Sequence, residues 1–355
     1  MTQNLELVSA NTGEAALEPN HKTLTVDCDA RVMKKMLFLS ALTALISSSA
    51  SLAQTSSSAS FRFVAFGDMP YTIPAVYPKF ERLIGAINAS KPEFSVFVGD
   101  TKGGSVECSD ANFQKVLDYF GTFEQPLTYA VGDNEWTDCH REKAGKYNPL
   151  ERLSKVRSMF FKDNMSLGKT KMPLERQADV SAHKQMVENS RWSKNGVLFT
   201  SLHIPGSNNG FERNLESITE YFARDKANVE WINASFEMAT RNNAPAMVFA
   251  FQADMDFGQT NAYAISGFAN TLAAFKAGAA AFKKPVLLVH GDTHLLTIDN
   301  PLMSADGKSR LENVTRLMVM GADQVQAVEV GVNPSSAGVF SFMPMIVREN
   351  LNAAK

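Results

Sequence analysis

From residue 61 onward, the hydrophobic pattern alternates between short apolar runs and segments with helical spacing. Apolar runs at 61–66, 94–98 and 127–131 have the length and composition of buried strands. Between these runs, apolar residues recur at helical spacing over 80–87 and 113–120. This order predicts parallel strands joined by crossover helices, because a tight turn cannot connect parallel neighbours.

The same alternation continues through the second half of the chain. Apolar runs at 197–202, 247–251 and 286–289 predict further strands. Helical spacing predicts one helix around 229–239 and an alanine-rich helix over roughly 264–282. Together with the first half, the pattern predicts an α/β fold.

Two stretches depart from this alternation. Residues 139–192 are polar and weakly patterned, and we expect helices and loops over the site there rather than a separate domain. Three β-rich runs at 314–320, 325–332 and 339–343 have no helices between them. They predict antiparallel strands at the C-terminal end of the sheet.

The N-terminal residues have the pattern of a leader. Met33-Lys34-Lys35 precedes an apolar run over 36–46 and then small residues up to Ala53, which is typical of a secretory signal peptide. The apolar run has about a dozen residues, whereas a membrane span needs about 20. An uncut anchor is the alternative. The expected organisation is an untranslated or non-native leader (1–32), a signal peptide (33–53), a linker (54–60), one domain (61–345) and a tail (346–355).

Net charge and cysteine content limit the partners and the compartment expected for the protein. The 355 residues carry a formal net charge of −2, so no affinity for nucleic acid is expected. No stable membrane span is expected after signal cleavage. Cys28 lies upstream of the cut, and Cys108 and Cys139 remain as an even pair, in keeping with an exported, periplasmic or secreted protein.

Acidic residues follow several predicted strands directly. Three strands end in Gly-Asp and a later one ends in His-Gly-Asp-x-His. Because the carboxyl ends of parallel strands open onto one edge of a sheet, we expect these side chains to converge. Gathered carboxylates repel each other and favour one or two divalent metals between them, although each Gly-Asp could also be an ordinary turn. The residues concerned are Asp68, Asp100, Asp133, Asp292 and His294.

The order of these motifs resembles the signature of the calcineurin-like metallophosphoesterases, the group that includes the purple acid phosphatases. The matching pieces are Gly67-Asp68, Gly99-Asp100, Gly132-Asp133-Asn134-Glu135 and Gly291-Asp292-Thr293-His294. The resemblance spans about 61–342. It implies a layered fold of parallel or mixed β-sheets flanked by helices, with a β-rich C-terminal end.

The chain diverges from that signature at several positions. Pro70 stands where the family often has a histidine, and Tyr71 one residue further on could face the metals. Four other family ligands or contacts are replaced, by Asp133 for Asn, Asn134 for a phosphate-contacting His, Gln252 for a lone His, and Asp292 for the first His of the last motif.

The resemblance implies two divalent metal ions. One would take Asp68, Asp100 and His294, and the other would share Asp100. The second ion's remaining ligands, all of them oxygen donors on this chain, would be Asp133, Gln252 and Asp292. Mn, Mg or Fe is therefore expected rather than Zn. The same substitutions allow a weak or empty second site.

The implied reaction is hydrolysis of a small phosphoester by a metal-activated water. Asn134, with His203 or Arg141, would add hydrogen bonds to the phosphoryl oxygens. His203 follows a predicted strand and could be a metal ligand, a proton donor or a structural hydrogen bonder. The rival interpretation is a non-catalytic exported binding protein on a degenerate phosphoesterase fold, which the lost histidines support.

Cys108 and Cys139 are predicted to form a disulfide. Each lies a few residues beyond a strand end, after Asp100 and after Asp133. Both strand ends should border the same edge, so the bond would join two loops of the site.

We expect the exported protein to begin at Gln54, because Ser51 and Ala53 place small residues at positions −3 and −1 of the cut. N-terminal sequencing of the exported protein measures this directly. A mature chain that still carries Lys34 would contradict the prediction.

Overall fold

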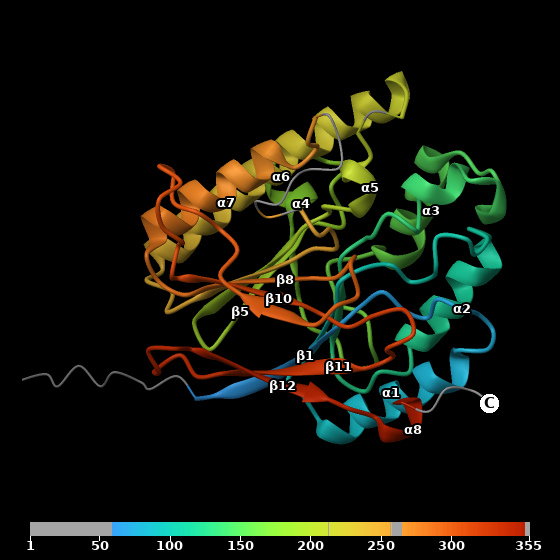
Figure 1. The fold of residues 1–355 in the computed structure, drawn as a ribbon, viewed down its shortest axis with the longest axis horizontal. Helices are drawn as coiled ribbons and strands as arrows, with labels where there is room; N and C mark the ends of the chain where they lie inside the picture. Colours follow the sequence, from blue (N-terminus) through green and yellow to red (C-terminus); the bar gives the residue numbers. More distant parts are fainter. Residues whose placement is uncertain (1–58, 212, 256, 258–264, 352–355) are drawn as a thin grey trace, which may run out of the picture. The chain divides into compact units, whose positions relative to one another are not determined.

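The structure, a computed structural model, describes residues 59–351 apart from 212, 256 and 258–264 (Figure 1). The predicted leader, signal peptide and cleavage site, most of the linker and residues 352–355 of the tail lie outside the described residues. None of the helices in the described part is long and apolar enough to cross a membrane.

Twelve strands form two mixed sheets in the described residues. The five-stranded sheet has the order β12-β11-β1-β2-β3, in which β1, β2 and β3 are parallel and β11 and β12 add antiparallel neighbours. Its strands are β1 (Phe61–Phe66), β2 (Ser95–Phe97), β3 (Leu127–Tyr129), β11 (Ala327–Val332) and β12 (Phe340–Met345).

The seven-stranded sheet has the order β4-β5-β6-β7-β8-β10-β9. Its four central strands β6, β7, β8 and β10 are parallel, and antiparallel strands lie at both edges. The strands are β4 (Glu175–Arg176), β5 (Ser190–Lys194), β6 (Val197–Ser201), β7 (Met247–Ala250), β8 (Val286–His290), β9 (Thr297–Asp299) and β10 (Val314–Met318).

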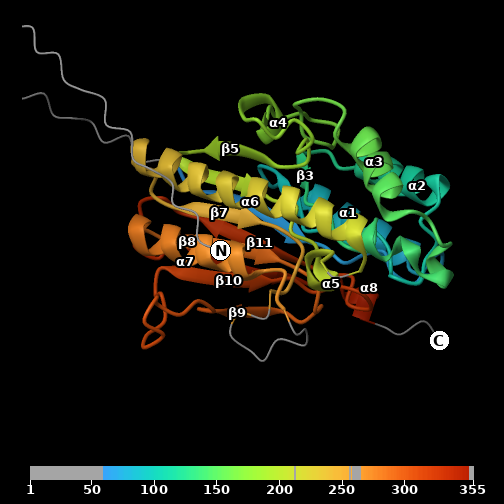
Figure 2. The same cartoon turned by 90° about the horizontal axis from the view of Figure 1, so that it is seen from above.

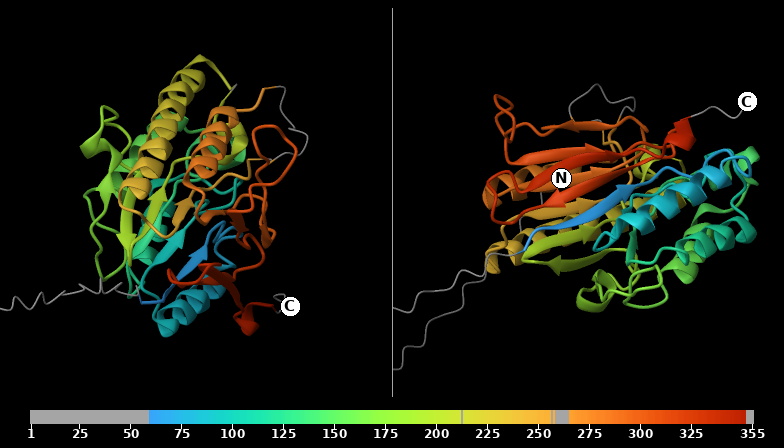
Figure 3. Two further views of the ribbon diagram at one scale, coloured as in Figure 1. Left: turned by 90° about the vertical axis from the view of Figure 1, so that its left-hand side faces the viewer. Right: turned by 90° about the horizontal axis from the view of Figure 1, so that it is seen from below.

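Helices cover the outer faces of both sheets. In Figure 2, α6 and α7 lie across the seven-stranded sheet, and the view from below in Figure 3 shows α1, in cyan, across the five-stranded sheet. The helices are α1 (Tyr77–Ser90), α2 (Asp110–Phe120), α3 (Pro149–Phe160), α4 (Gln177–Val180), α5 (Gly206–Asn209), α6 (Leu215–Arg241), α7 (Ala269–Phe282), α8 (Arg348–Leu351), and the 3₁₀ turns η1 (Thr137–His140) and η2 (Glu142–Ala144).

The layered packing of sheets and helices explains why the sequences of the central strands are continuous apolar runs. Phe61, Phe63 and Ala65 of β1 face a core shared by the two sheets, whereas Val64 and Phe66 face a second core beneath α1, α2 and α3. Side chains on a strand point alternately to opposite faces, so a strand covered on both faces needs apolar residues throughout. The predicted α/β fold of mixed sheets flanked by helices is confirmed.

Some predicted details were wrong. The run at 314–320 becomes β10, which pairs parallel with β8, and only β11 and β12 form the predicted antiparallel C-terminal end. The connection of more than twenty residues between β8 and β10 includes β9 and is long enough for a crossover. The helix expected around 229–239 begins at Leu215, where Asn214 caps it, and the alanine-rich helix begins at Ala269.

The predicted disulfide is confirmed. Cys108 and Cys139 are bonded, with Cα atoms 5.8 Å apart, and both are fully buried. The bond fastens the loop after β2 to η1, which follows β3. It therefore restrains two of the loops that carry acidic residues.

Replacing both cysteines (Cys108→Ser with Cys139→Ser) should lower the free energy of unfolding by about 3–4 kcal/mol. The reason is that the bond spans 31 residues and removes loop entropy from the unfolded chain. Urea denaturation measures the loss. Dithiothreitol should destabilise the native chain to the level of the variant and leave the variant unchanged; equal sensitivity of both proteins would contradict the assignment.

Candidate active site

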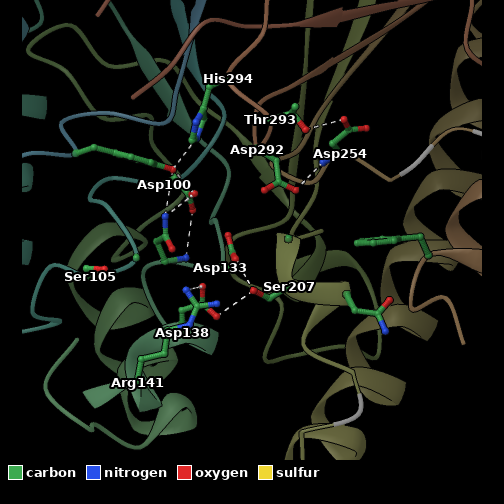
Figure 4. Close-up of a pocket in the computed structure, with 16 residues that line it drawn as sticks. Asp100, Ser105, Asp133, Asp138, Arg141, Ser207, Asp254, Asp292, Thr293 and His294 are labelled. Atoms are coloured by element: carbon green, nitrogen blue, oxygen red, sulfur yellow. Dashed lines mark hydrogen bonds and ion pairs between the residues drawn. The ribbon is translucent and has the colours of Figure 1, made fainter. Parts of the chain in front are cut away.

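A polar cavity of about 590 Å³ lies where the parallel strands of both sheets end (Figure 4). Loops after β1, β2, β3, β6, β7 and β8 all contribute to its wall. The residues that line it are Tyr71, Asp100, Gly104, Ser105, Asp133, Asn134, Asp138, Arg141, Gly206, Ser207, Asn208, Asp254, Phe268, Asp292, Thr293 and His294. Carboxylates dominate this wall, as expected from the strand ends.

The glycine before each aspartate lets neighbouring loops approach closely. A Cβ on Gly132 would lie 2.2 Å from Asp100 Oδ1, and a Cβ on Gly291 would lie 2.1 Å from Asp68 Oδ2. Three of the aspartates and one histidine also have left-handed backbone conformations, which are unfavourable for non-glycine residues. Their φ angles are 53° for Asp68, 57° for Asp100, 79° for Asp292 and 66° for His294.

Asp100 is held by donors from two loops. Tyr71 donates its hydroxyl to Asp100 Oδ2 at 2.6 Å, and Asn134 donates from Nδ2 to the same oxygen at 2.7 Å and from its backbone to Oδ1 at 3.2 Å. Burial raises the pKa of Asp100 well above its usual range, and the charges of Asp133 and Glu135 add to this effect. The Tyr71 hydroxyl is likewise buried, and its pKa is raised.

Asp68, Asp133 and Asp292 form the other part of the acidic wall. Asp68 Oδ1 accepts a hydrogen bond from the Asp292 backbone at 3.0 Å, but Asp68 Oδ2 and Asp133 Oδ1 are buried without a partner. Burial, with the charge of Asp133, raises the pKa of Asp292 to about 8. Burial, with the charges of Asp292 and Asp133, also raises the pKa of Asp68.

A third set of contacts links the acidic residues to the positively charged guanidinium of Arg141. Ser207 donates to Asp133 Oδ2 at 2.7 Å or to Asp138 Oδ1 at 3.0 Å, and Arg141 Nη1 lies 2.7 Å from Asp138 Oδ2. Burial, with the charge of Asp133, raises the pKa of Asp138 to about 7. The Arg141 side chain is 49% exposed and can reach a ligand in the cavity.

Pattern analysis did not identify Asp138, Ser207 or Asp254 as site residues. Asp138 follows the third Gly-Asp motif by five positions on the turn η1, and no motif marks it. Asp254 lies two residues beyond Gln252, and its backbone donates to Asp292 Oδ2 at 2.9 Å. Its position after a predicted strand was the only available signal.

The residues fit a divalent cation only in part. Among the described residues, no three His, Cys, Asp or Glu side chains are already gathered as a metal-binding group. However, the unpartnered buried oxygens of Asp68 and Asp133 are donors of the kind that Mg²⁺, Mn²⁺ and Ca²⁺ bind. These unpartnered oxygens, rather than a preformed set of metal ligands, are the feature that suits a cation.

The structure brings five of the six predicted metal ligands to one place. Tyr71 links Asp100 to His294, since its hydroxyl lies 3.1 Å from His294 Nε2, and His294 Nε2 lies 3.8 Å from Asp68 Oδ1. The sixth, Gln252, is fully buried behind Gly99 and accepts a hydrogen bond from the Gly206 backbone. Like Asp68, Gln252 does not itself line the cavity.

His203 lies outside the cavity in a buried ion-pair network. Its Nδ1 is 2.8 Å from Glu188 Oε1, and Arg157 contacts both carboxylate oxygens of Glu188 at 2.6 and 3.0 Å. The geometry therefore favours the structural alternative for His203 over a metal ligand or proton donor. His290 also lies at the end of a strand, is fully buried and stacks on Phe251.

Polar residues of α6 support the loop that carries Ser207. Ser207, Asn208 and Asn209 have φ angles of 48°, 53° and 59°, so three successive non-glycine residues are left-handed. Arg224, which is fully buried on α6, donates to the Asn209 carbonyl at 2.8 Å. Asn228 of the same helix donates to the His203 carbonyl at 2.8 Å, so α6 holds both ends of this loop.

Comparisons with known proteins find only distant likeness. No protein family model matches the chain, and no curated protein matches it. One solved structure is described as GAP50, the anchor in the inner membrane complex of Plasmodium, with 11% identity and a TM-score of 0.47 over 81% of this chain and 89% of that chain.

Two other matches carry enzyme names. The purple acid phosphatase PPD1 of yellow lupin, Lupinus luteus, is 12% identical with a TM-score of 0.44, over 83% of this chain and 55% of that chain. A putative 5'-nucleotidase from Staphylococcus aureus is 9% identical with a TM-score of 0.45, over 81% and 53%. Likeness at this distance assigns no activity to this chain.

Replacing Glu188 by Gln should lower the free energy of unfolding at pH 7 by about 3–5 kcal/mol, because it leaves Arg157 without its buried counter-charge. Burial by itself would raise the pKa of Glu188, but Arg157 and His203 outweigh it and hold the pKa well below its usual range. The carboxylate's contribution is therefore complete above the unfolded pKa, about 4.3, and is lost as the pH falls below it.

Urea unfolding of both proteins between pH 7 and pH 3.5 measures this contribution. The difference between native chain and variant should be steady down to about pH 5 and then shrink. Glu142→Gln is a matched control, because Glu142 forms an exposed pair with Lys146 and should change stability by less than about 1 kcal/mol. A Glu188 difference that stays constant to pH 3.5 would contradict the depressed pKa.

Proposed function

We propose that the chain is a metal-dependent hydrolase of phosphoesters. The observation that carries the proposal is the set of buried carboxylate oxygens at the strand ends, with Asp68 Oδ2 and Asp133 Oδ1 lacking partners. Unpaired buried carboxylates are costly, and a divalent cation is the simplest group that offsets their charge. Asp133 also lines the cavity, which contains the guanidinium group of Arg141, and a phosphoester needs both a cation and a group that binds its phosphoryl oxygens.

Arg141 would bind the phosphoryl oxygens. Among the residues that line the cavity in the described part of the chain, it is the one with a permanently positive side chain. Asp138 orients its guanidinium at 2.7 Å, while the absence of a side chain at Gly104 leaves it room, because a Cβ there would lie 2.9 Å from Arg141 Nη1. A planar guanidinium suits two phosphoryl oxygens at once.

The acidic residues would hold the cation. Asp68 and Asp133 supply the unpartnered oxygens, while Asp292, Asp100 and His294 lie beside them. A bound divalent cation lowers the pKa of a water ligand and offsets charge that develops on phosphoryl oxygens. Asn134 lines the cavity next to Asp100 and would contribute an amide near the same oxygens. Oxygen donors favour Mn or Mg over Zn.

The alternative is a non-catalytic binding protein with the same fold. Its support is that Asp100 and His294 are already satisfied by hydrogen bonds with Tyr71. In that case the cavity would retain an anion through Arg141 without turning it over.

We also propose that the protein is exported. The buried Cys108–Cys139 disulfide supports this, because such bonds persist in oxidising compartments. The signal-like pattern before Gln54 supports it independently.

A panel of phosphomonoesters, phosphodiesters and nucleotides assayed with Mn, Mg, Fe, Ca and Zn tests the function. We expect hydrolysis that EDTA abolishes and that Mn or Mg restores better than Zn. Asp292→Asn should lower kcat/KM by about 10²-fold or more, because it removes a charged oxygen donor from the cation site.

Asp118→Asn is the matched control. It makes the same chemical change near the C-terminal end of α2, where, among the described residues, the Asp118 side chain accepts one hydrogen bond, from Gln114, and it should leave kcat/KM within twofold of the native chain. Phosphate binding by the purified protein without hydrolysis of any ester, under every metal, would instead support the binding protein.

A further inference from the structure

The four aspartates at the strand ends differ in how far their oxygens are already hydrogen-bonded. Asp100 accepts three hydrogen bonds, from the Tyr71 hydroxyl and from the side chain and backbone of Asn134. By contrast, Asp68 and Asp133 each keep one buried oxygen without a partner. We call Asp100 with its hydrogen-bond partners the satisfied half of the acidic wall, and Asp68 and Asp133, with the neighbouring Asp292, the unsatisfied half.

The Tyr71 hydroxyl is the centre of the satisfied half. It donates to Asp100 Oδ2 at 2.6 Å, and it lies 3.1 Å from both Asn134 Nδ2 and His294 Nε2. One donated and two accepted hydrogen bonds use the full capacity of a hydroxyl group. The rings of Tyr71 and His294 also pack edge to face, with centroids 5.0 Å apart. The hydroxyl thus stands between two residues that the motifs assign to one metal ion.

The loop after β1 is shaped to bring Tyr71 to this position. Its ring lies against Gly103, where an added Cβ would be 3.3 Å from the Tyr71 carbonyl oxygen and 3.5 Å from Tyr71 Cγ. A Cβ at position 103 would be tight against the Tyr71 carbonyl oxygen and in ordinary contact with the ring. The Tyr71 side chain is thus held at both ends. Three polar groups contact its hydroxyl, and the loop at Gly103 packs against its ring.

The unsatisfied half is a separate group of oxygens. Asp68 Oδ1 is tied to the Asp292 backbone at 3.0 Å, and Gly206 leaves space beside both Asp292 and Asp133. A Cβ on Gly206 would lie 3.0 Å from each Asp292 carboxylate oxygen and 3.1 Å from Asp133 Cγ. The two carboxyl groups therefore approach the same point from different loops.

We propose that the chain binds one divalent cation rather than two, and that the Tyr71 hydroxyl takes the place of the other. The single cation belongs to the half with the unpartnered oxygens of Asp68 and Asp133, beside Asp292. The hydroxyl satisfies Asp100 and His294 without adding positive charge. The inference rests on the cation site of the proposed function, but it does not depend on which reaction the site performs.

A consequence for ligand binding follows from the charge. A site with one cation offers a phosphoester less positive charge than a site with two, so more of the anion's charge is left for Arg141. Arg141 lines the same cavity as Tyr71 and Asp133. Affinity for inorganic phosphate should therefore depend strongly on this guanidinium.

Manganese stoichiometry tests the proposal. The metal-free chain is incubated with excess Mn²⁺, separated from unbound metal and analysed by mass spectrometry for metal per chain, with no phosphoester present. We expect one Mn²⁺ for the native chain and two for Tyr71→Ala, in which Asp100 and His294 are freed. Tyr147→Ala is the matched control with one, because Tyr147 is a half-buried tyrosine bonded to Glu107 at 3.1 Å outside the cavity.

The native chain alone can overturn the proposal, so it does not depend on folding of the variants. Two Mn²⁺ per native chain, or an electron paramagnetic resonance spectrum of a coupled manganese pair, would reject it. No bound Mn²⁺ would reject the cation site altogether, and one Mn²⁺ in folded Tyr71→Ala would reject the role of Tyr71. One Mn²⁺ without hydrolysis in the ester panel would reject the proposed function and leave this inference standing.

Discussion

The burial of several acidic side chains beside one another is the constraint on which the site depends. Asp68, Asp100 and Asp133 are 0%, 2% and 6% exposed, and each raises the cost of charging its neighbours. In water these carboxylates would be solvated separately. Within the protein they need hydrogen-bond donors or cations, because the low-dielectric interior strengthens their repulsion.

The loops meet this requirement partly by bonding to each other. The backbone of Asn134 donates to Asp100, that of Asp292 donates to Asp68, and that of Asp254 donates to Asp292. Each of these bonds joins the ends of two different strands. Such contacts require close approach of backbones, which is why glycine precedes the aspartates at positions 67, 99, 132 and 291.

Polar contacts from α6 hold the loop that carries Ser207 against the acidic residues. Arg224 and Asn228 of α6 fasten a loop with three successive left-handed residues, and the Arg157–Glu188–His203 network lies beside it. Left-handed conformations at non-glycine residues persist where surrounding contacts fix them. Ser207 can therefore face Asp133 and Asp138 in a conformation that the loop alone would not favour.

The amino-acid sequence by itself determined the α/β class and the residues of the acidic wall. Its apolar runs and helical spacing identified the central strands, and Gly-Asp at successive strand ends identified four aspartates that the structure brings together. Asp68, Asp100 and Asp133 lie together because the parallel strands before them share one edge, whereas Asp292 follows β8 of the other sheet. The same argument paired Cys108 with Cys139.

Only the tertiary structure decided what those residues contact. No local pattern distinguishes β10, parallel to β8, from an antiparallel strand, since pairing depends on where a crossover returns. Pattern also could not separate His203, buried against Glu188, from a residue of the cavity, because both follow strands. Ser207 follows β6 of the seven-stranded sheet and reaches Asp133 and Asp138, which follow β3 of the other sheet, so these contacts exist only once both sheets are assembled.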